Sequence, residues 1–579
     1  MSTPSHRPKR TSVRVQELRL PLLVRADDLA RAQGVDGLAR GEARGAADEE
    51  RAAEAMLALR RQLSARLRLA TQDLGALRLV RRALDARHRS PIYVYTVDLD
   101  LATDAAQRVI GSHKAEPTPR VERSRWRLAR PSDAAPPIII GSGPAGLMAA
   151  LALADAGLCP IVLERGRAVK ERAHDVSRLY SRGVLDPESN VCYGEGGAGT
   201  FSDGKLHTRV GDPRVADVMQ ALIAHGADAD IVVDNRPHVG TDRLVRLIER
   251  WREDLCARGV RFRFSTAVTD FDIRDGALQG VLLGDGERLE TRHAVLASGH
   301  SARDVWVKLR ARGVALEPRP FAVGFRIEHP QALIDELRYG RQAGQSWLPA
   351  ADYRLTFNDA AGERRGVYSF CMCPGGVVVP TPTEPAALCI NGMSHAARSG
   401  AFANSALVVT VGDADFADFA KDAELRGVGF QRHVERAAYA AGGGAFVAPA
   451  MRVTDFLAGA SPRALGRTSY RRGLAPADLG ALYPPAVIGA LQRALRAFDH
   501  KLHGFVTDEA TLIGVETRTA SPVRVPRDES LQARGARGLY PAGEGMGYGG
   551  GIVSAAVDGL RAAEALLHGL GAIEEREPS

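Results

Sequence analysis

The sequence of 579 residues predicts an α/β fold in which a parallel-sheet domain is split by an inserted domain and preceded by a small N-terminal one. A strand at residues 137–140 runs into a glycine-rich turn and an apolar helix, and similar signals return near residue 540. Between them the pattern changes to mixed strands, long loops and helices. The length also exceeds one ordinary core. We therefore expect several domains.

Composition places the chain among globular proteins. Apolar residues make up 45% and charged residues 25%, which excludes wholesale disorder and fibrous repeats. Six scattered cysteines favour a reducing, cytoplasmic location over a disulfide framework. The basic N-terminus lacks the apolar core of a secretory signal. An uncharged stretch at 134–154 is long enough to be taken for a transmembrane helix. Its prolines and glycines favour a buried strand–turn–helix unit instead, so no membrane association is expected.

The first 136 residues predict a tail, a domain and a linker. Residues 1–12 are expected to form a disordered tail, residues 13–110 a basic α+β domain, and residues 111–136 a linker without periodicity. Alternating apolar residues predict strands at 13–23, with a phase change near Glu17, and at 92–97. Leucines at helical spacing around residue 63 predict a helix between them. Residues 1–130 carry a net charge of +10 and the remainder −2, which is typical either of a surface for an acidic partner such as RNA or of solvated arginine-rich helices.

The glycine-rich turn has the pattern of a dinucleotide site. In PIIIGSGPAG (137–146), Gly141 permits the tight turn, Gly143 lets the backbone approach a pyrophosphate, and Gly146 allows close packing of helix and strand. The helix N-terminus faces the phosphates. A second strand ends at Glu164, where a carboxylate accepts hydrogen bonds from ribose hydroxyls. These features predict a Rossmann-type domain whose first part covers residues 137–304.

The C-terminal part of this domain, at 511–579, distinguishes FAD from NAD. A strand ends at Gly543 and Glu544, and Gly551 and Ile552 then open a final helix, which resembles the closing motif of flavoproteins. In that motif the acidic residue binds a ribityl hydroxyl, and the helix N-terminus stabilises the charge that the isoalloxazine gains on reduction. The strand before Ser298 and Gly299 likewise resembles the Ala-Thr-Gly turn of flavoproteins.

We therefore predict FAD as the cofactor. The residues expected to contact it are Gly141, Gly143, Pro144, Ala145, Gly146, Glu164, Arg165, Gly197, Thr200, Val268, Gly299, Gly543, Glu544, Gly551 and Ile552. No second strand–GxGxxG–helix unit is visible, so NAD(P)H would bind only transiently as a donor. No motif with metal-ligand spacing is visible either, and no metal is expected.

Catalytic residues are less clearly marked. The run YGEGGAGTFSDGK (193–205) can wrap a planar cofactor and offer Thr200, Ser202 or Lys205 to its edge, or it can be a flexible surface loop. Cys371 and Cys373 fit either a redox relay with a strained, reducible disulfide or two small buried hydrophobic residues. His300, Arg518 and His395 are candidates for handling a substrate anion or a proton, and each also has a structural interpretation.

Several long motifs together resemble a known family. They include the 193–205 run, FCMCPGG (370–376), NGMS (391–394) and ETR (516–518). The chain resembles, over nearly its whole length, the largely uncharacterised FAD-dependent dehydrogenases labelled NAD(FAD)-utilising or NAD(P)/FAD-dependent oxidoreductases. The resemblance implies a glutathione-reductase-like FAD domain with an inserted substrate or cap domain at 305–510, but no particular substrate.

Three functions follow as hypotheses. The first is an oxidoreductase that passes electrons or hydride between FAD and a small-molecule or protein substrate. The second is an RNA- or protein-associated flavoprotein that docks an acidic partner through its basic N-terminal domain. The third is a scaffold that FAD stabilises without turnover. The oligomeric state is not predicted.

Overall fold

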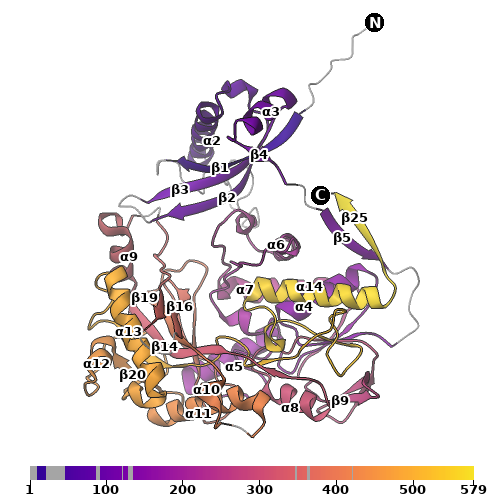
Figure 1. The fold of residues 1–579 in the computed structure, drawn as a ribbon, viewed down its shortest axis with the longest axis vertical. Helices are drawn as coiled ribbons and strands as arrows, with labels where there is room; N and C mark the ends of the chain where they lie inside the picture. Colours follow the sequence, from indigo (N-terminus) through magenta and orange to yellow (C-terminus); the bar gives the residue numbers. More distant parts are fainter. Residues whose placement is uncertain are drawn as a thin grey trace.

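The computed structural model describes residues 10–20, 46–86, 91–119, 122–127, 135–345, 348–360, 365–419 and 421–578 (Figure 1). The expected tail lies outside the described residues up to residue 9. Its last three residues belong to a strand, because β1 begins at Arg10. No helix in the described ranges is long and apolar enough to cross a membrane.

The N-terminal domain is a four-stranded antiparallel sheet packed against two helices. The sheet order is β2-β3-β1-β4, the arrangement of a ferredoxin-like βαββαβ unit. Its elements are β1 (Arg10–Leu20), α2 (Ala46–Leu67), β2 (Leu77–Asp85), β3 (Ile92–Ala102), α3 (Thr103–Gly111) and β4 (Glu116–Pro117). The expected phase change is confirmed as a bulge, since the β1–β3 register shifts between Val15 and Leu18 and Glu17 has φ 53°.

The segment 111–136 is not the featureless linker that we expected. β4 completes the N-terminal sheet, and β5 (Glu122–Arg127) pairs antiparallel with β25 (Ile573–Pro578) at the other end of the chain. Figure 1 shows this pair beside α14. Strand β5 is only six residues long, and its partner lies at the other end of the sequence. Local periodicity therefore could not reveal it.

The Rossmann-type domain contains a five-stranded parallel sheet of order β24-β12-β6-β7-β8. The two faces of this sheet are covered by different elements. On one face, the middle residues of β6, β7, β12 and β24 pack against helices α4, α6, α7 and α14. On the other face, the flanking residues pack against α8 and the three-stranded meander β9–β11. The strands are β6 (Ile138–Ile140), β7 (Ile161–Leu163), β8 (Arg261–Arg263), β9 (Val268–Arg274), β10 (Ala277–Leu283), β11 (Arg288–Glu290), β12 (Ala294–Leu296) and β24 (Leu539–Pro541). The helices are α4 (Pro144–Asp155), α5 (Val169–Arg182), α6 (Arg214–Ala224), α7 (Thr241–Ala257), α8 (Arg303–Ala311) and α14 (Ile552–Gly569). Strand order reverses between β6 and β12, where ligands bind in such sheets.

The inserted domain is built on a seven-stranded sheet of order β15-β16-β19-β14-β22-β20-β21. Its main strands are β14 (Phe321–Pro330), β15 (Thr356–Asp359), β16 (Arg365–Cys373), β19 (Phe402–Val411), β20 (Ala448–Arg452), β21 (Leu474–Pro476) and β22 (Thr511–Glu516). Two further pairs are β17 (Val377–Pro380) with β18 (Ile390–Met393), and β13 (Glu317–Pro318) with β23 (Val523–Arg524). Its helices are α9 (Gln331–Tyr339), α10 (Asp413–Phe416), α11 (Arg426–Ala441), α12 (Val453–Ala458) and α13 (Pro485–Lys501).

The expected boundaries of the insertion, 305 and 510, are both displaced. Strand β22 lies between β14 and β20 in the inserted sheet, so the insertion extends past residue 510. Helix α8 packs against the meander of the first domain, so the insertion begins after it. A strand buried on both faces looks the same in sequence whichever sheet it joins.

Candidate functional site

A cleft of about 1450 Å³, partly open to solvent, runs from the carboxyl ends of the parallel strands to the inserted domain. Residues from both domains line it. From the Rossmann-type domain come Gly141, Gly143, Pro144, Ala145, Glu164, Arg165, Gly197, Ser202, Asp203, Lys205, Val268, Gly299, His300, Gly543, Glu544, Gly551 and Ile552, and from the inserted domain come Cys371, Cys373, Asn391 and Gly392. Most of the predicted cofactor residues are thus brought together.

The glycine-rich turn has the geometry expected for a pyrophosphate site. Gly141 has φ 103°, and a β-carbon there would collide with the carbonyl oxygen of Ala297. Gly146 does not line the cleft; a β-carbon there would collide with the carbonyl of Gly141, so it serves helix–strand packing as predicted. At Gly143 a β-carbon would meet only Gly197, at 3.7 Å, and its φ is −72°. The protein itself therefore does not require glycine at 143, but a ligand in the cleft would.

Two helices begin at the cleft without a side-chain cap. Gly143 is the N-cap of α4 and Gly551 that of α14, and neither helix has a side-chain cap hydrogen bond. Their first N–H groups remain available for the negative charge that helix N-termini attract. A pyrophosphate at α4 and a flavin ring at α14 would satisfy both.

Glu164 lines the cleft, but the protein already fills its acceptor positions. One carboxylate oxygen accepts from the backbone N–H and the hydroxyl of Ser142, at 2.9 and 2.8 Å, and the other from the N–H groups of Gly166 and Gly194, at 3.0 and 2.9 Å. Its first role is thus to hold three turns together. A ribose hydroxyl would have to share these oxygens.

Glu544 differs from Glu164 in having an unused carboxylate. The side-chain carboxylate makes no hydrogen bond or ion pair with any part of the chain that the structure describes, although Glu544 lies in the cleft wall. Burial raises the pKa of this carboxyl to about 7, against the opposing effect of Arg319. An unpartnered carboxyl at this place fits the predicted contact with ribityl hydroxyls.

His300 and Arg165 lie at the end of the cleft near Val268. Arg165 stacks over Tyr193 at 4.6 Å and pairs with Asp304 at 2.7 Å. His300 Nδ1 lies 3.0 Å from the Ser301 hydroxyl. Burial, reinforced by Arg518, lowers the pKa of His300 to about 4. The imidazole is therefore neutral at pH 7 and is not a ready proton donor there.

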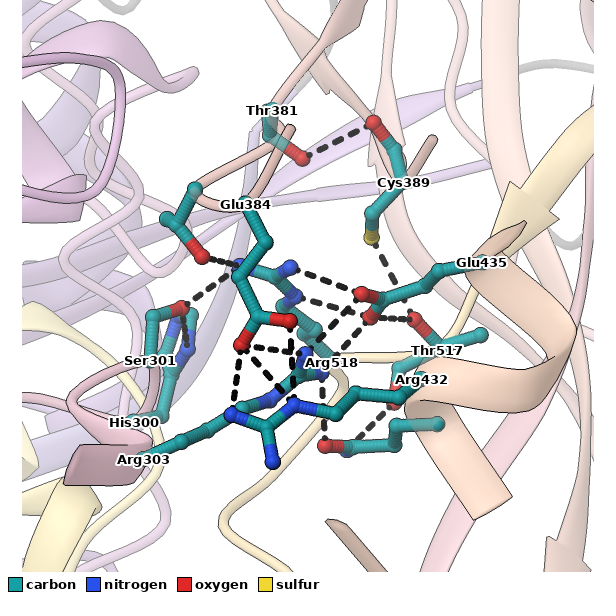
Figure 2. Close-up of polar contacts among 12 residues, drawn as sticks. His300, Ser301, Arg303, Thr381, Glu384, Cys389, Arg432, Glu435, Thr517 and Arg518 are labelled. Atoms are coloured by element: carbon teal, nitrogen blue, oxygen red, sulfur yellow. Dashed lines mark hydrogen bonds and ion pairs between the residues drawn. The ribbon is translucent and has the colours of Figure 1, made fainter. Parts of the chain in front are cut away.

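Arg518 is withdrawn from the cleft into a buried ionic network (Figure 2). Its guanidinium makes two hydrogen bonds of 2.9 Å with Glu435, which also binds Arg303, and it donates to the Ser301 hydroxyl. The expectation that Arg518 meets a substrate anion is thus not supported. Arg518 instead joins the inserted domain to Ser301 of the Rossmann-type domain, and Glu435 of α11 makes a second link through Arg303 of α8.

Two further candidates also lie apart from the cleft. Thr200 borders a small apolar pocket behind the 193–205 loop, where its hydroxyl is 3.4 Å from the Glu195 carbonyl. His395 is exposed and lies 3.8 Å from Asp242. Loop conformation decides which side chains of a Gly-rich run point inward, and spacing alone does not reveal it.

A thiol and cation cluster closes the other end of the cleft. Lys205 Nζ lies 3.3 Å from Asp203 and 3.8 Å from the sulfur of Cys373. Behind the Cys373 sulfur lies Arg326, which is fully buried and pairs with Glu516 at 2.7 Å. Sequence reasoning missed this arginine. Cys371 is exposed to the cleft, so the interpretation of both thiols as buried hydrophobic residues is wrong for Cys371. Asn391 and Glu516 lie within the family motifs, and these motifs were the sequence signal that could have pointed to this cluster.

Models of protein families match the chain in three regions. A family model described as FAD binding domain matches residues 137–177, one described as FAD-dependent protein, C-terminal domain-like matches 320–519, and a domain of unknown function matches 48–100. The second match supports the displaced boundaries of the insertion. The residues described form no group of side chains suited to a metal ion.

Among solved structures, the chain is similar to CtdE in complex with FAD (11% identity, 76% of this chain and 88% of that one, TM-score 0.29) and to glycine oxidase from Bacillus cereus (12%, 75% and 95%, TM-score 0.28). An uncharacterised protein of Clostridium beijerinckii is 40% identical over 518 residues, which are 88% of this chain and 95% of the relative. FAD is the cofactor that the matched binding domain and the geometry of the cleft indicate. The chain belongs to the same family of FAD-dependent proteins as this Clostridium beijerinckii protein.

Proposed function

We propose that the protein is an oxidoreductase that exchanges a hydride between bound FAD and a small-molecule or protein substrate at the Lys205 end of the cleft. The observation that carries this proposal is that the residues predicted to bind FAD share one cleft with Cys371 and Asn391 of the inserted domain. When bound, FAD supplies reversible two-electron chemistry. The Rossmann-type domain alone would leave that end of the cleft open.

The residues of the chain would position the reactive ring. Uncapped N–H groups at Gly551 and Ile552 favour negative charge at the adjacent end of the flavin. Lys205 adds a cation on the same side of the cleft. Strands β16 and β18 of the inserted domain line this end and replace part of the solvent there, which strengthens both electrostatic effects.

Partner docking through the N-terminal domain receives little support from its charges. Arg14 and Arg78 both pair with Asp98 within the domain. Arg82 pairs with Asp230 and Asp234 of the Rossmann-type domain. An arginine held in an ion pair within the chain is less available for phosphate contacts. These contacts favour a structural role for this domain.

The test is anaerobic reduction of the purified holoprotein with NADH and NADPH separately, followed by visible absorbance. We expect one of them to bleach the flavin, since the single dinucleotide domain leaves a nicotinamide donor to bind transiently. A flavin-free Gly143→Val variant is the control and should consume neither. A flavin that neither nucleotide reduces would show the donor to be wrong. A flavin that also fails to reoxidise with quinone, disulfide and dye acceptors would contradict the proposed turnover.

A further inference from the structure

Cys371 and Cys373 both line the cleft, and the strand that carries them is irregular. The pairing of β16 with β19 shifts register between Phe370 and Cys373, as at a β-bulge. Cys371 has φ 45°, a left-handed conformation that costs a residue with a β-carbon roughly 1 kcal/mol or more. Arg326 holds it there by donating to the Cys371 carbonyl at 2.6 Å. Such strain persists where the surroundings determine it and often marks a functional position.

The sulfur of Cys373 lies between two cations. Lys205 Nζ is 3.8 Å away on the cleft side, and Arg326 Nη2 is 3.9 Å away on the buried side. The sulfur is also 3.3 Å from the carbonyl oxygen of Cys371. Any negative charge that forms on this sulfur would therefore lie between two cations.

The charges around the pair leave room for one negative charge. Lys205 and Asp203 form one ion pair, and Asp203 also binds Arg398, while Arg326 binds Glu516. Counted over the described residues of this cluster, three cations face two carboxylates. A thiolate at Cys373 would balance them. Cys371 differs: its side chain is exposed at the wall of the cleft, but desolvation by the protein around it still raises the pKa of its thiol to about 12 and keeps it neutral.

We propose that Cys371 and Cys373 form a second two-electron redox centre, which cycles between a disulfide and a thiol–thiolate pair in exchange with the flavin. The proposal rests on the proposed function, since it places the flavin ring at this end of the cleft. It extends that function from a single redox centre to two in series, with the cysteine pair on the side of the inserted domain.

The step balances in atoms and electrons. Two electrons and one proton pass from the reduced anionic flavin to the disulfide, and the flavin returns to its oxidised form. The Sγ–Sγ bond breaks, Cys371 takes the proton, and Cys373 leaves as a thiolate between Lys205 and Arg326. A Cys-x-Cys disulfide closes a short, strained ring, and strained disulfides are the readily reduced ones. Electron flow from flavin to disulfide is therefore favourable.

A third cysteine provides a matched control. Cys192 also lines the cleft, but its sulfur contacts the Thr381 carbonyl, at 3.8 Å, and no other sulfur within the described part of the chain. A Cys192→Ser variant removes a cleft thiol without removing the pair.

The experiment counts electrons per flavin in the holoprotein. Wild type, Cys371→Ser, Cys371→Ser/Cys373→Ser and Cys192→Ser are reduced anaerobically with dithionite, desalted and titrated with ferricyanide. Dithionite reduces a flavin whatever its natural donor, so the result does not depend on the proposed function. Samples quenched with N-ethylmaleimide are weighed by mass spectrometry, which counts free thiols directly.

We expect four electrons per flavin for wild type and Cys192→Ser, and two for both variants that lack Cys371. Two additional labelled thiols should appear on reduction of wild type and of Cys192→Ser, and in neither variant that lacks Cys371. Because the single variant leaves buried Cys373 in place, it serves if the double variant does not fold. Two electrons per flavin in wild type, with an unchanged thiol count, would overturn the redox centre. If wild type gives four electrons but neither nicotinamide reduces it, the centre stands and the proposed donor fails.

Discussion

Lys205 Nζ lies 3.8 Å from the sulfur of Cys373, and the two residues belong to different domains. Lys205 is the last residue of the 193–205 glycine run, and Cys373 ends β16 of the insertion. The reactive end of the cleft therefore exists only while the inserted domain is docked. Contacts that fix the docking should govern both stability and chemistry.

The Glu435 network is the first such contact. Glu435 is fully buried and accepts from Arg303, Arg518 and Thr517. A Glu435→Gln change leaves buried Arg518 without its carboxylate and Arg303 with only Glu384, so we expect the free energy of unfolding to fall by about 3–5 kcal/mol. Glu384→Gln is the control, because Glu384 is part exposed and bridges Arg303 and Arg432. It should cost about 1 kcal/mol or less. Equal shifts in urea midpoint would contradict this.

Gly143 tests the cofactor position without disturbing the protein. A β-carbon at 143 meets only Gly197 at 3.7 Å, so Gly143→Ala should fold with an unchanged thermal midpoint. Gly143→Val projects a branched side chain to where the pyrophosphate approaches and should abolish flavin binding. The ratio of flavin absorbance to protein absorbance measures this. Full flavin occupancy in a folded Val variant would show that the phosphate lies elsewhere.

The sequence predicted the parts of the fold whose signals are local. The PIIIGSGPAG turn, β6 and β7 follow from glycine spacing and apolar runs, and α14 follows from its opening glycines. Sheet membership was not predictable where a strand is buried on both faces, as β22 is, or where its partner is remote, as for β5. Arg326 and Asp203 were missed because a buried charge is recognised by its partners in space, and these lie far apart in sequence.

Glu544 should make the flavin-free protein sensitive to pH. Burial raises its pKa to about 7 in the folded state, above the 4.5 of an exposed carboxyl. The folded state therefore holds the proton more tightly, and this group destabilises the protein progressively as pH rises from about 4.5 to 7. We expect unfolding free energy to fall by about 2 kcal/mol over that range from this group. Denaturant titrations of wild type and Glu544→Gln at several pH values measure it, and parallel curves would exclude the effect.

Deleting residues 1–119 should leave FAD bound. Every residue that lines the cleft lies at or after Ile140. The deletion nevertheless exposes Val233 and leaves Asp230 and Asp234 without Arg82, so stability should fall by about 1–3 kcal/mol. Flavin fluorescence and the thermal midpoint report the two effects separately. A folded truncation that has lost FAD would show that the N-terminal domain is needed to form the cleft.

Lys205 should set the redox potential of the cysteine pair. Reduction creates a negative charge on Cys373, 3.8 Å from Lys205 Nζ, while the disulfide carries none. Removing the cation penalises only the reduced state. For a loss of about 1.4 kcal/mol, the two-electron potential falls by about 30 mV. Lys205→Met should show this fall in glutathione buffers of graded potential, read by alkylation and mass spectrometry. Lys205→Arg keeps the charge and should remain within about 10 mV of wild type, since 30 mV marks a tenfold change in the equilibrium. A wild-type potential in Lys205→Met would place the stabilising charge at Arg326 alone.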